Sequence, residues 1–139
     1  MSSAILRTAA IAWLVVGCSS GGGSATFGTT PIAQLAGDSG VVHIDVYSAP
    51  DPIIRGSNEL RYVISDVATG APLDGLTVGV VPFMPAMGHG ASIVPTVTAE
   101  GQGKYLVTDV VLIMPGDWQL RTTISGSVTD TATVTVSVP

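Results

Sequence analysis

Two thioethers and an imidazole lie close together in the segment Val81–Gly90, which reads VPFMPAMGHG. Thioether sulfur and neutral imidazole together favour Cu(I) over hard cations. Prolines and glycines surround the donors Met84, Met87 and His89, so we expect a turn-rich loop to present them. The segment therefore predicts a soft-metal site. Because methionine commonly fills gaps in protein cores, the alternative is that both methionines plug the end of the domain while His89 caps a turn.

From about residue 38 onward, short stretches of alternating apolar and polar residues are bounded by Gly, Pro, Asp and Asn, which is typical of β-strands. No window of ten or more residues there carries a helical stripe. Seven strands are predicted: Val42–Val46, Leu60–Ile64, Leu76–Val81, Ser92–Ala99, Lys104–Val111, Trp118–Ile124 and Thr131–Val138. This spacing predicts an all-β fold, a seven-stranded antiparallel immunoglobulin-like β-sandwich.

Two residues refine this fold. Pro95 cannot donate a ladder hydrogen bond, so its strand is expected at a sheet edge. Trp118 is the only tryptophan of the predicted domain, and we expect it in the core. In an antiparallel sandwich the first, third and fifth connections lie at one end. Met114, in the fifth connection, is therefore expected near the loop of Met84, Met87 and His89, as a possible fourth copper ligand.

The N-terminus has the pattern of an export signal, since Arg7 precedes a short apolar run. The tetrapeptide Val-Val-Gly-Cys that ends at Cys18 resembles the lipobox of bacterial lipoproteins, which implies that Cys18 is lipidated. We therefore expect a signal peptide over residues 1–17, a Gly/Ser/Thr-rich tether over 18–37 and one domain over 38–139. The expected location is outside the cytoplasm, lipid-anchored to a bacterial membrane and facing the periplasm or the cell exterior. A buried or incidental cysteine in an uncleaved leader is the alternative.

Composition excludes several other functions. Only 11% of the residues are charged, the net charge is −5 and the few cations are scattered, which argues against a nucleic-acid partner. Gly37-Asp38-Ser39-Gly40 superficially matches the nucleophile motif of chymotrypsin-like proteases, but the residues around it do not, and we expect a turn there. His43 and Asp45 lie two positions apart on one strand face, where a solvated pair is more common than a site. The sequence therefore predicts a protein that is not an enzyme.

Three sequence motifs occur in the order found in a known family. They are Leu76–Gly90, Gly103-Lys104-Tyr105 and Met114-Pro115-Gly116-Asp117-Trp118. Together they resemble the YtkA-like domain, which is related to FixH-type proteins and more distantly to CopC-like copper carriers. The resemblance covers roughly Val41–Val138 and implies an extracytoplasmic Ig-like sandwich with a copper-handling role. It implies Met84, Met87 and His89 as the candidate ligands. This chain has neither the N-terminal His of CopC-like carriers nor the spanning helix of FixH-type proteins.

The sequence thus predicts a membrane-anchored lipoprotein that binds Cu(I) for copper transfer or tolerance, with an envelope protein or copper acceptor as its partner. Two alternatives without a metal stay open: an Ig-like interaction module that contacts another envelope protein, and a sensor domain.

Overall fold

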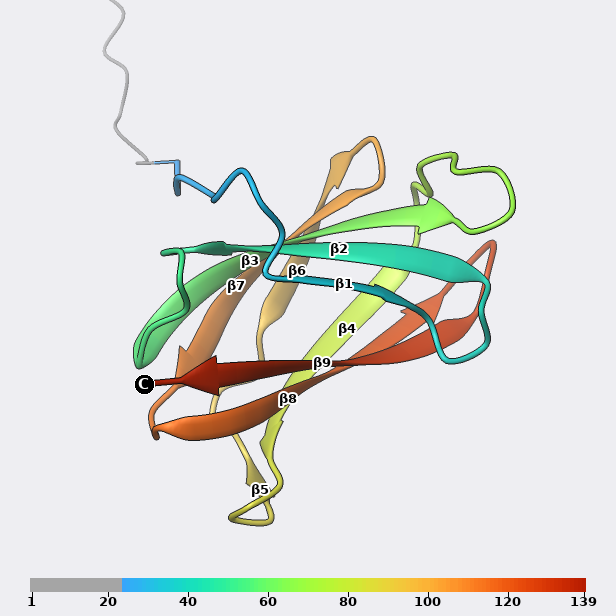
Figure 1. Cartoon of the computed structure of the whole chain (residues 1–139). Helices are drawn as coiled ribbons and strands as arrows, with labels where there is room; N and C mark the ends of the chain where they lie inside the picture. The colour runs from blue at the N-terminus through green and yellow to red at the C-terminus, as the bar shows by residue number, and fades with distance from the viewer. Residues whose placement is uncertain (1–23) are drawn as a thin grey trace, which may run out of the picture.

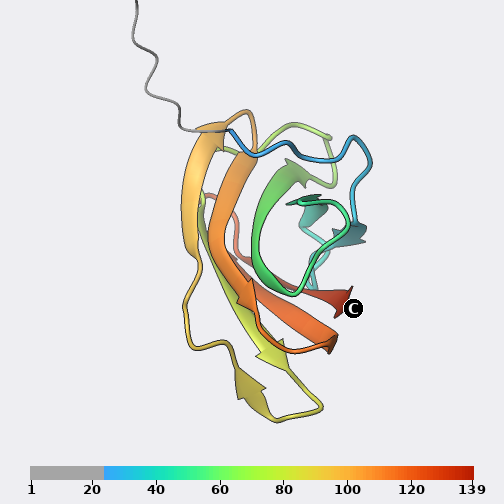
Figure 2. The ribbon, with the colours of Figure 1, turned by 90° about the vertical axis from the view of Figure 1, so that its left-hand side faces the viewer.

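The computed structural model describes residues 24–139, and these residues form two antiparallel β-sheets. Sheet A has the strand order β1-β2-β3-β7-β6 and sheet B has the order β5-β4-β8-β9. Figures 1 and 2 show the two sheets as the layers of a sandwich. The strand bounds are β1 Ala33–Ala36, β2 Val42–Ala49, β3 Gly56–Asp66, β4 Thr77–Met84, β5 His89–Gly90, β6 Thr96–Gly101, β7 Lys104–Leu112, β8 Gly116–Ser125 and β9 Asp130–Val138.

The predicted all-β sandwich is confirmed, and its inner faces follow the period-two pattern of the sequence. Along β9, every second residue is buried and the residues between them are exposed. Both sheets contribute to one continuous apolar core. Trp118 is fully buried in this core, as the sequence predicts. No helix among residues 24–139 is long and apolar enough to cross a membrane.

Residues 24–139 form nine strands instead of the predicted seven, and β4 runs on to Met84, which was predicted in a loop. Three further differences follow. Residues 33–36, which the sequence assigns to the tether, form β1 and pair with β2. His89–Gly90 forms the short strand β5 instead of a loop. The predicted strand Ser92–Ala99 begins only at Thr96, directly after Pro95, because proline offers no N–H for a ladder. Its strand β6 is an edge strand of sheet A, as Pro95 predicts.

Sheet B positions the segment of interest. β8 lies between β4 and β9 and is paired with both of them along its length. β4 ends at Met84, the chain turns, and β5 runs back beside it. In Figure 1 this β4–β5 hairpin projects beyond the rest of the sandwich. The signal peptide over 1–17, Cys18 and residues 19–23 of the tether lie outside the described residues.

Candidate functional site

The β4–β5 hairpin holds three of the four predicted copper ligands. Met84 is the last residue of β4 and His89 is the first of β5, and the two are register partners. Side chains of directly opposed residues leave an antiparallel ladder on the same face. Between them, the turn is closed by hydrogen bonds from the N–H groups of Met87 and Gly88 to the carbonyl of Met84, at 3.2 and 3.0 Å. Gly88 has a φ of 68°, which favours glycine at that position. Local turn chemistry therefore makes Met84 and His89 register partners at the end of the hairpin, with Met84 buried and His89 exposed.

Met84 lies at the boundary between hairpin and core. Its side chain is 4% exposed and belongs to the buried cluster. A Cβ atom added at Gly116 would come within 3.0 Å of the Met84 methyl group, so Met84 packs directly under Gly116, the first residue of β8. The connection between β7 and β8 ends just before Gly116 and contains Met114. The third and fifth connections of the predicted topology thus meet at one end of the sandwich.

Met87 and His89 are at the exposed side of the hairpin. The Met87 side chain is 55% exposed, and His89 is exposed as well. His89 Nδ1 lies 3.0 Å from the carbonyl oxygen of Gly90. Because a carbonyl can only accept, Nδ1 must carry the proton, which leaves the lone pair of Nε2 as the free acceptor. A hydrogen bond from the ring N–H to a backbone carbonyl also orients metal-binding histidines in many proteins.

Met114 has a structural role in addition to the predicted role of its sulfur as a ligand. Its carbonyl oxygen accepts a hydrogen bond from Trp118 Nε1 at 3.0 Å, and its side chain packs against the core while staying partly accessible. The buried indole therefore fixes the turn that covers Met84. Two residues of this motif are thereby explained: Gly116 leaves room for Met84, and Trp118 anchors the turn.

The second family motif, Gly103-Lys104-Tyr105, is also explained by packing. The buried Tyr105 hydroxyl donates to the carbonyl of Leu73 at 2.7 Å and accepts from the N–H of Leu76 at 3.1 Å. Gly103 has a φ of 72°, and a Cβ there would come within 2.5 Å of the Ile64 carbonyl oxygen. Both residues hold the long connection that enters β4. Gly103 and Tyr105 therefore serve the fold, and they lie in sheet A, away from the hairpin.

His43 and Asp45 form a pair on the outer face of sheet A. His43 Nε2 lies 3.0 Å from Asp45 Oδ1, and Gln34 Nε2 donates to the same oxygen at 2.9 Å. Both side chains are partly accessible to solvent, at 42% and 24%. Among residues 24–139 there is no group of three His, Cys, Asp or Glu side chains arranged to hold a metal ion. That finding does not concern methionine sulfur.

Sequence reasoning missed a buried carboxylate, that of Asp130 at the start of β9. It accepts hydrogen bonds from the N–H groups of Ser39 and Thr131 at 2.8 Å, Val41 at 3.1 Å and Val42 at 3.3 Å. Burial by itself raises the pKa of Asp130, but these four donors outweigh it and hold the pKa below its ordinary value. The Gly37–Gly40 segment forms a turn, as predicted, and Asp130 fastens that turn to sheet B. The spacing of residues along the sequence could not predict these contacts, because Asp130 lies about ninety positions from Ser39, Val41 and Val42.

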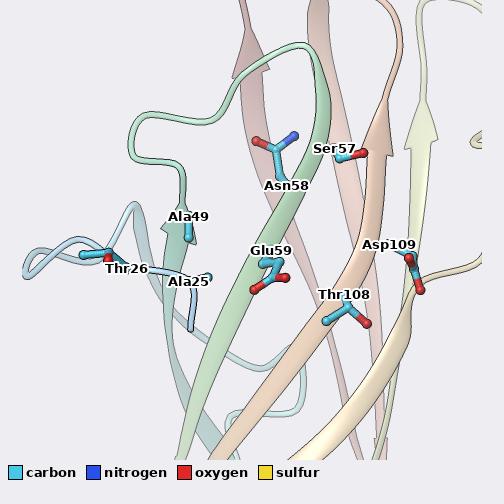
Figure 3. A pocket seen from close by; sticks show the side chains of 8 residues that line it. All are labelled: Ala25, Thr26, Ala49, Ser57, Asn58, Glu59, Thr108 and Asp109. Carbon is cyan, nitrogen blue, oxygen red and sulfur yellow. The ribbon is translucent and has the colours of Figure 1, made fainter. Parts of the chain in front are cut away.

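A cleft of about 350 Å³ lies on the outer face of sheet A. Figure 3 shows Glu59 on β3 beside Thr108 on β7, with Asp109 beyond Thr108. The register of β3 and β7 shifts at this point, and Asp109 adopts a φ of 60° in the bulge. The lining residues are Ala25, Thr26, Ala49, Ser57, Asn58, Glu59, Thr108 and Asp109. The cleft thus presents carboxylates and hydroxyls.

Comparison with known proteins adds one finding. A family model described as YtkA-like matches residues 38–123, well over half of the chain. Neither the curated proteins nor the solved structures give a match. The matched residues include the β4–β5 hairpin, the Tyr105 contacts and the turn anchored by Trp118. The chain therefore belongs to the YtkA-like family.

Proposed function

We propose that this YtkA-like protein is a lipid-anchored envelope protein that binds Cu(I) at the β4–β5 hairpin and passes it to a copper-accepting partner. Met84, Met87 and His89 are the proposed ligands, Met114 is the candidate fourth ligand, and Cys18 carries the lipid. The protein is proposed to be a carrier without catalytic activity. Copper is its cargo, so the protein has only to select the ion, hold it and release it.

The observation that carries this proposal is the pairing of Met84 with His89 across the hairpin. One thioether and one imidazole leave the same face of a two-stranded ladder, and the second thioether belongs to the turn between them. All three donors are neutral when His89 is unprotonated, and the set suits a soft monovalent ion. The contact of Nδ1 with Gly90 keeps Nε2 available for a metal.

Accessibility also supports a carrier. Met87 and His89 are exposed, so an ion held by them would be within reach of a partner, while the buried Met84 would supply a rigid donor from the core. Figures 1 and 2 place the first described residues and β5 at opposite sides of the molecule. The chain that leads from Cys18 therefore enters the described fold on the side opposite the hairpin.

The proposal is tested by titrating Cu(I) against a competing chelator under anaerobic conditions, with residues 19–139. The nine strands and the apolar core that the structure describes lie between residues 32 and 138, so this segment contains the described fold. Met84→Leu, Met87→Leu and His89→Gln remove one donor each and keep the side-chain volume close to the original. We expect each change to weaken binding at least tenfold. Equal, weak binding by all four proteins would remove the proposal.

The anchor is tested separately. In cells, the wild-type chain should fractionate with membranes and Cys18→Ser should not. Recovery of both proteins in the same fraction would contradict lipidation at Cys18 and would leave the copper proposal standing.

A second candidate function, a protein-interaction module without metal, is favoured by the exposed apolar side chains at this end. Ile54 is 44% and Ile113 is 52% exposed, and Arg55 Nε donates to the Ile113 carbonyl at 2.8 Å, which ties their two connections together. Exposed apolar groups that gather in this way often mark partner surfaces. A partner captured equally by copper-free wild type and by His89→Gln would favour this candidate.

A further inference from the structure

A second cleft lies on the outer face of sheet A, away from the hairpin, with a volume of about 410 Å³. One wall is the N-terminal strap, residues 24–32, which is drawn in blue in Figure 1. The strap is tied to β2 by hydrogen bonds from the Gly28 N–H to the Ser48 carbonyl and from the Ile32 N–H to the Val46 carbonyl. The floor comes from β2, β3 and β7. The lining residues are Ala25, Phe27, Gly28, Tyr47, Arg61, Val63 and Lys104.

The strap holds an aromatic ring in a fixed position over this floor. The Arg61 guanidinium lies 4.1 Å from the centroid of the Phe27 ring. The same guanidinium donates two hydrogen bonds to Glu100, at 2.7 and 3.1 Å, so its plane is fixed. Tyr47 is the register partner of Arg61 and therefore shares its face. The cleft thus has two aromatic rings around an immobilised cation.

Two cations line the cleft, Glu100 pairs with one of them, and the Asp51 carboxylate lies beside the lining residue Gly28. The chain has five Lys and Arg residues, and two of them line this cleft. Glu100 neutralises Arg61. Within residues 24–139, Lys104 has no ion-pair partner and neither its ammonium group nor the Tyr47 hydroxyl has a hydrogen-bond partner. The register partners of Lys104 are Val63 and Gly101, which are uncharged. Asp45, on the far side of Val63, already binds Gln34 and His43.

The neighbouring cleft in Figure 3 has the opposite character. Ala25 of the strap lines both clefts, but the neighbouring one presents the carboxylates of Glu59 and Asp109. An anion would be repelled on that side of the strap and attracted on the other. The strap therefore separates an acidic cleft from one in which, within residues 24–139, the Lys104 ammonium group and the Tyr47 hydroxyl have no partner and the walls are largely apolar.

We propose that the cleft of Phe27, Tyr47 and Lys104 binds a small organic anion with a single negative charge and a flat apolar body, such as an aromatic carboxylate. The carboxylate pairs with Lys104 and accepts from the Tyr47 hydroxyl, and the flat body lies against Phe27 and Val63. The volume is in the range of small-ligand sites, in which a few polar groups orient a mainly apolar ligand. This site is independent of the proposed copper site.

Benzoate is the first probe. Its binding is monitored by the chemical-shift changes that it causes in the two-dimensional NMR spectrum of residues 19–139. We expect saturable shifts for the amides around Phe27, Tyr47 and Lys104. Benzamide keeps the ring without the charge and acetate keeps the charge without the ring, and each should bind at least tenfold more weakly. Absence of saturation with benzoate, or equal binding of acetate, would overturn the proposal.

Variants distinguish this cleft from general attraction to cations. Lys104→Met should weaken benzoate binding at least tenfold, Phe27→Ala should weaken it severalfold, and neither residue belongs to the buried core. The control is Arg121→Met, which removes a cation on the outer face of sheet B. Arg121 lies 3.8 Å over the Phe83 ring and forms the same kind of cation–aromatic pair as Arg61 and Phe27. Wild-type affinity is expected for Arg121→Met. Equal losses in the Lys104 and Arg121 variants would show nonspecific binding and would overturn the site.

Discussion

The two ends of sheet B are built differently. At one end, the Asp130 carboxylate accepts four backbone hydrogen bonds and fastens the turn before β2. At the other end, the β4–β5 hairpin closes on a few backbone hydrogen bonds and leaves the Met87 side chain and His89 exposed. The first end satisfies its polar side chain completely. The second leaves soft donor atoms available.

This difference shows which residues serve mainly stability and which are available for binding. Buried polar groups in proteins are almost always hydrogen-bonded. Removing one of them leaves its partners buried without a hydrogen bond, which lowers stability. Exposed thioethers and an imidazole contribute little to stability, so a stability argument does not explain them. Met84 is the exception at the hairpin end, because its side chain is both a proposed ligand and part of the core.

Trp118→Ala should give the largest loss. The indole is fully buried and anchors the turn over Met84 through the Met114 carbonyl. Removing it should lower the free energy of unfolding by about 3–5 kcal/mol, as measured by urea denaturation. A loss well below this range would mean that the hairpin end of the sandwich does not depend on its buried ring.

Met84→Ala should give the next largest loss of stability, and Met87→Ala should give almost none. The Met84 side chain is 4% exposed, so its truncation should cost about 2–5 kcal/mol. Met87→Ala, at a side chain that is 55% exposed, should change the free energy of unfolding by no more than about 0.5 kcal/mol. Similar losses for the two variants in thermal or urea unfolding would contradict the placement of Met84 in the core and Met87 at the tip.

Asp130→Asn tests the opposite end. The amide keeps the shape of the carboxylate but loses its charge and can accept through only one oxygen, so the expected loss at pH 7 is about 1.5–3 kcal/mol. No change in copper binding is expected, because the residue lies at the far end of the sheet. A copper defect in this variant would show that the two ends are coupled.

The same residue gives a pH dependence with a definite sign. Since the pKa of Asp130 is lowered in the folded state, its contribution to stability is present above the ordinary pKa of 3.8 and is lost as the pH falls through the folded value. The difference in free energy of unfolding between wild type and Asp130→Asn should therefore become smaller as the pH is lowered from 5 to values below the ordinary pKa. Unfolding curves at several pH values measure it, and a gap that widens on acidification would have the wrong sign.

The sandwich was predictable because its signal is local. Alternating valines and threonines in β9 specify an exposed and a buried face without knowledge of the partner strand. The meeting of the third and fifth connections followed from antiparallel order, and the contact of Met84 with Gly116 bears it out. The short strands β1 and β5 were missed, since four and two residues carry no periodicity and depend on pairing.

The candidate sites were predictable only in part, for the same reason. Donor types could be read from the segment around Met84, but the burial of Met84 and the exposure of Met87 depend on which turn covers the hairpin. The Asp130 contacts and the cleft under Phe27 join residues far apart in sequence. Neither has a motif, because the hydrogen-bond donors are backbone N–H groups and the aromatic wall comes from an irregular strap.

The proposed function depends on cuprous ion binding at the hairpin, and the most direct measurement is an anaerobic Cu(I) competition titration of residues 19–139. Wild type should bind one Cu(I) per chain, and the combined variant Met84→Leu, Met87→Leu, His89→Gln should lose that binding while it keeps the wild-type unfolding curve. Equal Cu(I) affinity in the two folded proteins would contradict the account.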